Sequence, residues 1–118
     1  MATFEIYHNP RCSKSRAALK LLEENGIEPT IRLYLDNPPD AAELKRVIQL
    51  LSTAPRGLIR DGENEYEELG LADETLSDDR LIEAMIFHPR LIQRPIVIRD
   101  GKVARIGRPP EAVLDLVG

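Results

Sequence analysis

Residues 3–35 read TFEIYHNPRCSKSRAALKLLEENGIEPTIRLYL, and this stretch decides the fold. Apolar and polar residues alternate over residues 3–7, which predicts a short strand. Apolar residues then recur at helical spacing, so we expect a helix from about residue 12 or 13 to residue 25, with Gly26 just past its end. A second strand is expected over Thr30–Leu35. Strand, helix and strand in so short a span predict a right-handed parallel βαβ unit.

The middle of the chain predicts helices. Asp40 and Ser77 are placed as N-caps of two helices with apolar residues at helical spacing, and Pro89 ends the second. Shorter helical pieces are expected near Arg56–Arg60 and Glu65–Leu69. We therefore expect a helical insertion over about residues 38–92.

The last part of the chain predicts a hairpin and a closing helix. Asp100-Gly101 lies between the apolar run Ile96–Ile98 and the segment Lys102–Ile106, which is a strong two-residue hairpin signal. Pro109 is expected as the first residue of a helix through Leu116. The order βαβ, helices, ββα is that of the thioredoxin-like fold. We therefore predict an α/β protein with a mixed four-stranded sheet, forming one domain over residues 1–118.

Composition and charge narrow the class of protein. The chain has 118 residues, a net charge of −4 and one cysteine. This length supports one domain with its own core, and the negative charge argues against general nucleic-acid binding. No apolar run reaches membrane-spanning length, and the start of the chain has no signal-peptide pattern. A single cysteine cannot form an internal disulfide, so we expect a reducing, cytoplasmic setting. We also expect a monomer.

Cys12 is the residue on which the functional interpretation depends, because it lies between the first strand and the first helix. Unpaired N–H groups and the helix dipole favour a thiolate there, and the same N–H groups can hold an oxyanion. The alternative is a small buried hydrophobe, but the polar and basic flanks favour a reactive thiol. Support for a bound anion is expected from the flanking residues Ser13, Lys14, Ser15 and Arg16.

The neighbours of Cys12 limit its chemistry. Ser15 stands three residues after Cys12, so disulfide exchange within a C-x-x-C pair is impossible and an outside thiol must complete any redox cycle. The hydroxyl groups of Ser13 and Ser15 are candidate donors to the thiolate. His8 is either a base or cationic partner of the thiol, or a histidine at the loop surface or strand end.

Three arginines far from Cys12 in sequence are candidates for holding an anion: Arg60, Arg94 and Arg108. Arg94 precedes Pro95, and a cis proline at this point of a thioredoxin-like fold would direct Arg94 into the site. Arg105 competes with Arg108, which we favour because a proline follows it. The acidic segment 61–68 is interpreted as a solvated face, with a docking patch as the alternative. Neither metal-ligand spacing nor a glycine-rich phosphate loop is present.

The chain as a whole resembles the glutaredoxin-coupled arsenate reductase family, and in particular its short housekeeping branch. Matching segments run in family order along nearly the whole sequence; they are residues 6–12, 33–35, 37–39, 58–60, 66–71, 94–97, 108–109 and 111–114. The combination is specific, although no single segment would be.

This resemblance implies a function and a set of site residues. Cys12 would be the nucleophile toward arsenate, His8 would assist it, and Arg60, Arg94 and Arg108 would hold the oxyanion and later the product. Arsenate would be reduced to arsenite with electrons from glutathione and glutaredoxin, and no cofactor would be bound. Two alternatives share the fold: an Spx-like regulator that binds RNA polymerase, and a general monothiol oxidoreductase acting on glutathione mixed disulfides.

Overall fold

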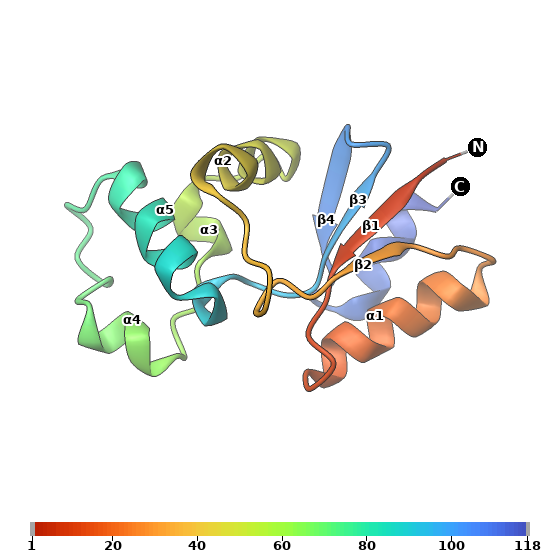
Figure 1. Ribbon diagram of the computed structural model, residues 1–118, viewed down its shortest axis with the longest axis horizontal. Helices are drawn as coiled ribbons and strands as arrows, with labels where there is room; N and C mark the ends of the chain where they lie inside the picture. The colour runs from red at the N-terminus through yellow and green to blue at the C-terminus, as the bar shows by residue number, and fades with distance from the viewer. Residues whose placement is uncertain (1, 118) are drawn as a thin grey trace. The chain divides into compact units, whose positions relative to one another are not determined.

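The computed structural model describes residues 2–117, which form two compact units (Figure 1). The first unit joins the chain up to Asn37 with the chain from Arg94 onward, and the second is Pro38–Gln93. The second unit covers almost the same residues as the expected helical insertion.

A mixed four-stranded sheet forms the centre of the first unit, in the order β2-β1-β3-β4. Its strands are β1 (Phe4–Tyr7), β2 (Thr30–Arg32), β3 (Ile96–Arg99) and β4 (Val103–Ile106). β1 is parallel to β2 and antiparallel to β3, and β3 is antiparallel to β4. The predicted α/β class, the parallel βαβ unit and the four-stranded mixed sheet are thus confirmed.

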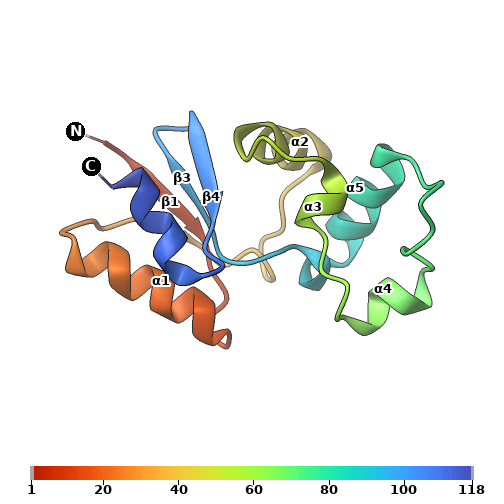
Figure 2. The same ribbon diagram turned by 180° about the vertical axis from the view of Figure 1, so that it is seen from behind.

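Two helices pack against one face of this sheet. They are α1 (Ser13–Glu24) and the 3₁₀ helix η2 (Pro110–Leu116), which lie side by side in both views (Figures 1 and 2). The core beneath them is apolar and almost fully buried; it consists of Ile6, Ala18, Leu22, Val97, Val113 and Leu116. Each such side chain contributes about 1.5–3 kcal/mol through its removal from water. This packing fixes α1, and with it the position of the residue that precedes the helix.

The second unit is helical. It contains α2 (Ala41–Leu50), α3 (Pro55–Leu58), α4 (Asn64–Glu68), α5 (Asp78–Phe87) and the 3₁₀ helix η1 (Pro89–Leu91). Helices α2, α3 and η1 all pack against α5. Both predicted caps are present: the Asp40 carboxylate accepts the N–H of Glu43 at 2.8 Å, and the Ser77 hydroxyl accepts the N–H of Arg80 at 3.1 Å. Satisfied N–H groups at these ends explain why the helices begin there.

The second strand is shorter than predicted. β2 ends at Arg32, and the N–H groups of Asp36 and Asn37 both donate to the carbonyl of Leu33, at 3.0 and 2.9 Å. This turn replaces strand pairing over the last three residues of the expected strand. Tyr34, within the turn, is fully buried. The prediction was too long because the apolar residues of the turn continue the alternating pattern of the strand, although their backbone has already left the sheet.

The closing helix begins later than predicted, and it is a 3₁₀ rather than an α-helix. Pro109 has φ −69° and ψ 163°, so it stays extended and η2 starts at Pro110. The physical reason is steric, because the ring of Pro110 disfavours helical geometry at the residue before it.

The hairpin turn forms where it was expected. Asp100 and Gly101 have φ values of 56° and 64°, and the N–H of Lys102 closes the turn on the Arg99 carbonyl. The final strand starts one residue after Lys102.

Candidate functional site

Cys12 is the N-cap residue of α1. Its backbone is extended, with φ −95° and ψ 122°, and its N–H donates to the carbonyl of Asn9 at 3.0 Å, which turns the chain from β1 into the helix. The backbone N–H groups of Lys14 and Ser15 are the second and third of the helix and have no partner within the helix itself. They lower the pKa of the Cys12 thiol, although the Cys12 side chain accepts no cap hydrogen bond.

The electrostatics around Cys12 favour the thiolate. Partial burial by itself raises the pKa of the thiol, but the backbone N–H of Ser15, the Arg94 side chain and the backbone N–H of Lys14, together with the Arg94 charge, outweigh it. The net result is a pKa below the usual range for cysteine. The residue is half-buried, so that a substrate can still reach the sulfur. A lowered pKa and partial exposure are the two properties of a reactive cysteine.

His8 supports the site through Ser15. Its Nδ1 lies 2.7 Å from the Ser15 hydroxyl, which also accepts the N–H of Asn9 at 3.0 Å. His8 and Ser15 are both buried. Burial, followed by the charge of Arg16, lowers the pKa of His8, so the ring is neutral at physiological pH. The interpretation of His8 as a cationic partner of the thiol is therefore not supported, because burial disfavours the charged ring.

The candidate anion ligands Arg108 and Arg105 differ in their position relative to Arg94. Arg108 Nη1 donates to the carbonyl oxygen of Arg94 at 3.2 Å, which places Arg108 beside the residue whose side chain lowers the pKa of Cys12. Arg105 instead lies 3.7 Å from the carboxylate of Asp115. Both Arg94–Pro95 and Arg108–Pro109 are cis peptides. Of the two competing arginines, it is Arg108 that the structure brings next to Arg94.

The remaining helix-start residues differ in position. Ser13 and Lys14 are exposed, and Arg16 donates from Nη1 to the carbonyl of Pro10 at 2.8 Å, across the loop that carries Cys12. Ser15 lowers the pKa of the thiol through its backbone N–H, whereas its hydroxyl is engaged with His8 and Asn9. Hydrogen bonds from the Ser13 or Ser15 hydroxyl to the thiolate stay a prediction.

Arg60 lies in the second unit, where its partners are acidic. Its Nε is 3.4 Å from Glu63 Oε1, and the other oxygen of Glu63 is 3.1 Å from Arg90 Nη2. Glu65 is 3.9 Å from Arg90 Nη1. The side chains of Glu63 and Glu65 are only 13% and 17% exposed. The interpretation of segment 61–68 as a solvated face is thus wrong for these two residues, which bind arginines instead.

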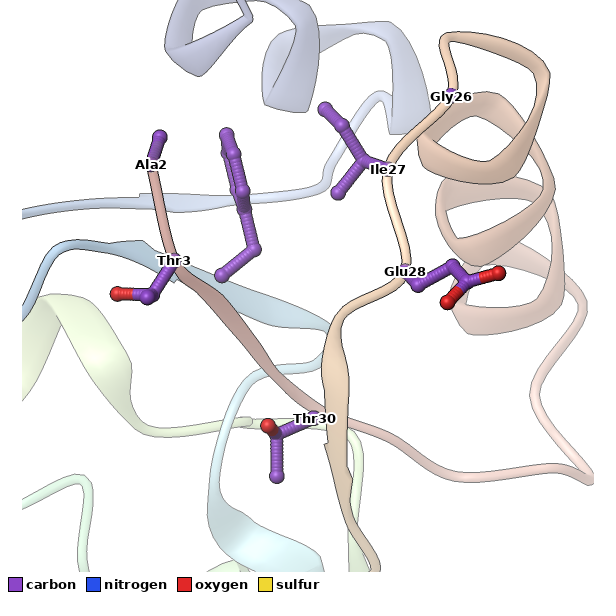
Figure 3. Close-up of a pocket in the computed structure, with 7 residues that line it drawn as sticks. Ala2, Thr3, Gly26, Ile27, Glu28 and Thr30 are labelled. Carbon is purple, nitrogen blue, oxygen red and sulfur yellow. The ribbon is translucent and has the colours of Figure 1, made fainter.

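Two pockets in the first unit differ in their relation to Cys12. One, of about 270 Å³, is lined by the loop before Cys12 and by the turn after β2; its residues are His8, Asn9, Pro10, Arg11, Leu33, Leu35 and Asp36. The other, of about 580 Å³, lies at the start of β1 and the end of α1, around Thr3, Ile27 and Glu28 (Figure 3). Cys12 stands at the opposite end of α1, about 18 Å away by the helical rise. The larger pocket is therefore separate from the thiol.

Within residues 2–117, histidine, cysteine and carboxylate side chains form no group of three or more that could hold a metal ion. In the same residues, every helix is too short or too polar to cross a lipid bilayer.

Comparison with known proteins identifies the family. Residues 7–116 match the family model described as "ArsC family". This chain belongs to the ArsC family. It is 56% identical over 115 residues to the Escherichia coli (strain K12) protein named "Uncharacterized protein YfgD", covering 97% of this chain and 96% of that one. It is also 50% identical over 114 residues to a protein named "Arsenate reductase" from Neisseria meningitidis serogroup B, covering 96% of this chain and 97% of that protein.

A solved structure shows the same fold. The structure described as "Arsenate reductase from Vibrio cholerae" superposes with a TM-score of 0.94 at 51% identity, covering 98% of both chains. The predicted thioredoxin-like fold and the family resemblance are thereby confirmed for this ArsC family member.

Two residues with structural roles at these sites were missed from the sequence. Asn9 accepts the N–H of Arg11 on its side chain at 3.0 Å and the N–H of Cys12 on its carbonyl, and so shapes the loop. An asparagine before a proline is a known turn signal. Glu63 stands three residues after Arg60, a spacing that brings side chains together along a helical turn. The pair of Arg60 and Glu63 was missed because Glu63 belongs to an acidic segment that was interpreted as solvated.

Proposed function

We propose that this ArsC family member reduces arsenate to arsenite, with the Cys12 thiolate as nucleophile. The observation that carries the proposal is the position of Cys12 as the N-cap of α1, where the backbone N–H groups of Ser15 and Lys14 and the Arg94 side chain lower the pKa of the thiol. A tetrahedral oxyanion that approaches this sulfur meets the same positive end of the helix. Relatives named arsenate reductase support this choice of substrate.

Arginine side chains would hold the oxyanion in place. A guanidinium group binds a tetrahedral oxyanion through two parallel hydrogen bonds and keeps its charge in a dry site. Arg94 and Arg108 are adjacent in the first unit through the hydrogen bond from Arg108 to the Arg94 carbonyl. The family resemblance adds Arg60 as a third ligand. His8 would act by fixing Ser15, and thus the helix start, rather than by carrying charge.

The reaction proceeds in two balanced stages. The Cys12 thiolate attacks arsenic, an S–As bond forms, and one oxygen leaves as water after it takes up protons. An external thiolate then attacks the Cys12 sulfur, the S–As bond breaks, and arsenic leaves as arsenite with the electron pair of that bond. A second external thiol attacks the resulting mixed disulfide, forms a disulfide with the first thiol and releases the Cys12 thiolate. Two thiols are oxidised, and one arsenic(V) is reduced to arsenic(III).

The reducing thiols would come from outside the chain. Cys12 is the only cysteine, and Ser15 occupies the place of a resolving cysteine. A mixed disulfide on Cys12 can therefore be resolved only by another molecule. We propose glutathione as the electron donor and glutaredoxin as the protein that regenerates the thiol.

The experiment that tests this function is a coupled assay of arsenite formation with glutathione and glutaredoxin. We expect turnover in the wild-type chain and none in Cys12→Ser, whereas Lys20→Gln, at an exposed position later on α1, should keep activity. A wild-type chain that forms no arsenite with a competent glutaredoxin would overturn the proposal.

A second measurement separates the alternatives. Sulfate or arsenate should slow the alkylation of Cys12 if the site binds oxyanions. A general monothiol oxidoreductase would show no such protection but would reduce glutathione mixed disulfides. An Spx-like regulator would recover RNA polymerase subunits in a pull-down and would show no anion binding.

A further inference from the structure

A nearly buried carboxylate in the second unit bridges two arginines. Glu63 Oε1 lies 3.4 Å from Arg60 Nε, and Glu63 Oε2 lies 3.1 Å from Arg90 Nη2. The Glu63 side chain is 13% exposed and that of Arg60 is 20% exposed, whereas Arg90 is 60% exposed. Such an ion pair is screened much less than one at the surface. Glu63 is therefore well placed to determine where the Arg60 side chain lies.

The backbone of Arg60 is anchored independently of this carboxylate. The N–H of Arg60 donates to the carbonyl of Leu91 at 2.7 Å, and the N–H of Gln93 donates to the carbonyl of Leu58 at 2.8 Å. Ile59 and Ile92 form an antiparallel bridge between these two hydrogen bonds, and both are buried. The backbone hydrogen bonds fix the start of the Arg60 side chain, so its remaining freedom lies in the side-chain torsions.

The geometry of the ion pair leaves the terminal nitrogens of Arg60 available to bind an anion. Glu63 Oε1 lies 3.4 Å from Nε, the nitrogen nearest the side-chain stem, and this contact is an ion pair rather than a hydrogen bond. An oxyanion is gripped best by two parallel N–H groups of one guanidinium, and the terminal nitrogens Nη1 and Nη2 supply such a pair. A carboxylate at Nε can thus orient the group without replacing an anionic ligand at the terminal nitrogens.

We propose that Glu63 is the positioning residue of Arg60: its negative charge beside Nε orients the guanidinium for oxyanion binding, and Arg90 holds Glu63 in turn. This inference rests on the proposed function, in which Arg60 is a ligand of arsenate. Glu63 itself does not touch the substrate. Because Arg90 takes its other oxygen, Glu63 cannot rotate freely away from Arg60. The cluster keeps an arginine oriented before any anion arrives, which reduces the side-chain ordering that binding would otherwise require.

Glu65 offers a matched control. It belongs to the same acidic segment, has a similar exposure of 17%, and pairs with Arg90 at 3.9 Å. The ion pair that Glu65 forms is with Arg90. Glu63→Gln and Glu65→Gln therefore remove the same charge from neighbouring positions, and only the first removes the ion pair to Arg60.

The experiment measures kcat and KM for arsenate in the coupled assay, and protection of Cys12 from alkylation by sulfate. We expect Glu63→Gln to raise KM and the protecting sulfate concentration about tenfold, which corresponds to roughly 1.4 kcal/mol, with kcat less affected. Glu65→Gln should stay within about twofold of wild type on both measures, as expected for a pair with an exposed arginine. Glu63→Asp, which keeps the charge with a shorter reach, should fall between them.

A double-mutant cycle decides whether Glu63 acts through Arg60. In an Arg60→Gln background, Glu63→Gln should add no further loss, because the group that it positions is gone. Additive effects in the cycle, or equal effects of Glu63→Gln and Glu65→Gln, would overturn this inference alone. If Glu63→Gln does not fold, Arg90→Gln serves as the second variant: a rise in KM supports the inference and an unchanged KM contradicts it. A wild-type chain with neither turnover nor anion protection would overturn the proposed function itself, and the role of Glu63 with it.

Discussion

Arginine side chains near Cys12 and arginine side chains around Arg60 have different kinds of partner. In the first unit, Arg16 and Arg108 donate to main-chain carbonyl oxygens, those of Pro10 and Arg94. In the second unit, Arg60 and Arg90 face the carboxylates of Glu63 and Glu65. A carbonyl oxygen orients a guanidinium without cancelling its charge, whereas a carboxylate orients it and neutralises it. Arginines paired with carbonyl oxygens therefore leave a positive electrostatic potential around them. Arginines paired with carboxylates are oriented, but the opposite charges leave little net potential.

This difference explains the state of the thiol. The field near Cys12 lowers the thiol pKa through Arg94 and through the backbone N–H groups of Lys14 and Ser15. In the second unit, the carboxylates of Glu63 and Glu65 would oppose any such effect. We therefore expect charge changes at Arg94 to alter the reactivity of Cys12.

The largest effect is expected for Arg94→Gln. This substitution removes a charged hydrogen-bond donor from the thiolate and from the oxyanion, so kcat/KM for arsenate should fall about 10²-fold, or roughly 2.7 kcal/mol. The pKa of the Cys12 thiol should rise, since a group that stabilises the charged form is lost. The rate of Cys12 alkylation as a function of pH measures this directly. A midpoint that stays at the wild-type value would contradict the assignment.

Ser15→Ala should lower stability without removing the field. The Ser15 hydroxyl is fully buried and bonds both His8 Nδ1 and the Asn9 N–H. Leaving these groups without a partner should reduce the free energy of unfolding by about 1–3 kcal/mol, measured by denaturant titration. The thiol pKa should stay low, because the backbone N–H of residue 15 remains. Ser13→Ala, at an exposed position, is the control and should change stability by less than about 0.5 kcal/mol.

Arg108→Gln and Arg105→Gln form a matched pair in the same segment. We expect Arg108→Gln to raise KM for arsenate about tenfold, or roughly 1.4 kcal/mol, because an oxyanion ligand beside Arg94 is lost. Arg105→Gln should leave KM within about twofold of wild type, since its exposed ion pair with Asp115 contributes little. Steady-state kinetics with arsenate varied would show the order. A larger rise in KM for Arg105→Gln than for Arg108→Gln would identify Arg105 as the oxyanion ligand instead.

Asp40→Ala tests a helix cap within the second unit. The Asp40 side chain caps α2 by accepting the N–H of Glu43. Its loss should reduce the free energy of unfolding by about 1 kcal/mol in denaturant titration, and Asp40→Ser should restore most of this. An Asp40→Ala variant as stable as the wild type would contradict this role of the cap.

The smallest effect is a pH dependence of stability that originates at His8. Burial and the Arg16 charge lower its pKa in the folded state. The unfolded chain therefore binds the proton more readily below about pH 6.5, and the free energy of unfolding falls as the pH is lowered through that range. His8→Gln should reduce this slope in denaturant titrations between about pH 7 and pH 5. If the free energy of unfolding of His8→Gln depends on pH as in the wild type, His8 is not the origin of this pH dependence.

Much of the fold could be predicted because the decisive signals are local. The alternation in β1, the helical spacing in α1, the caps Asp40 and Ser77, and the Asp100-Gly101 turn each depend on neighbouring residues. The errors arose where a local pattern continued past its element. Leu33 and Leu35 extend the apolar pattern of β2 into a turn, and Pro109 was assigned to the helix although Pro110 holds it extended.

The site was only partly predictable for a physical reason. The sequence by itself determined that a single thiol stands at a helix start, that it lacks a resolving partner, and that arginines suited to an oxyanion exist elsewhere in the chain. Only the tertiary structure decided which groups meet. It brought the Arg94 side chain to Cys12, paired His8 with Ser15 instead of with the thiol, and gave Arg60 a carboxylate partner. Helix-terminal N–H groups follow from backbone geometry, which local sequence sets, whereas the partners and protonation of side chains depend on burial and on residues distant in the chain.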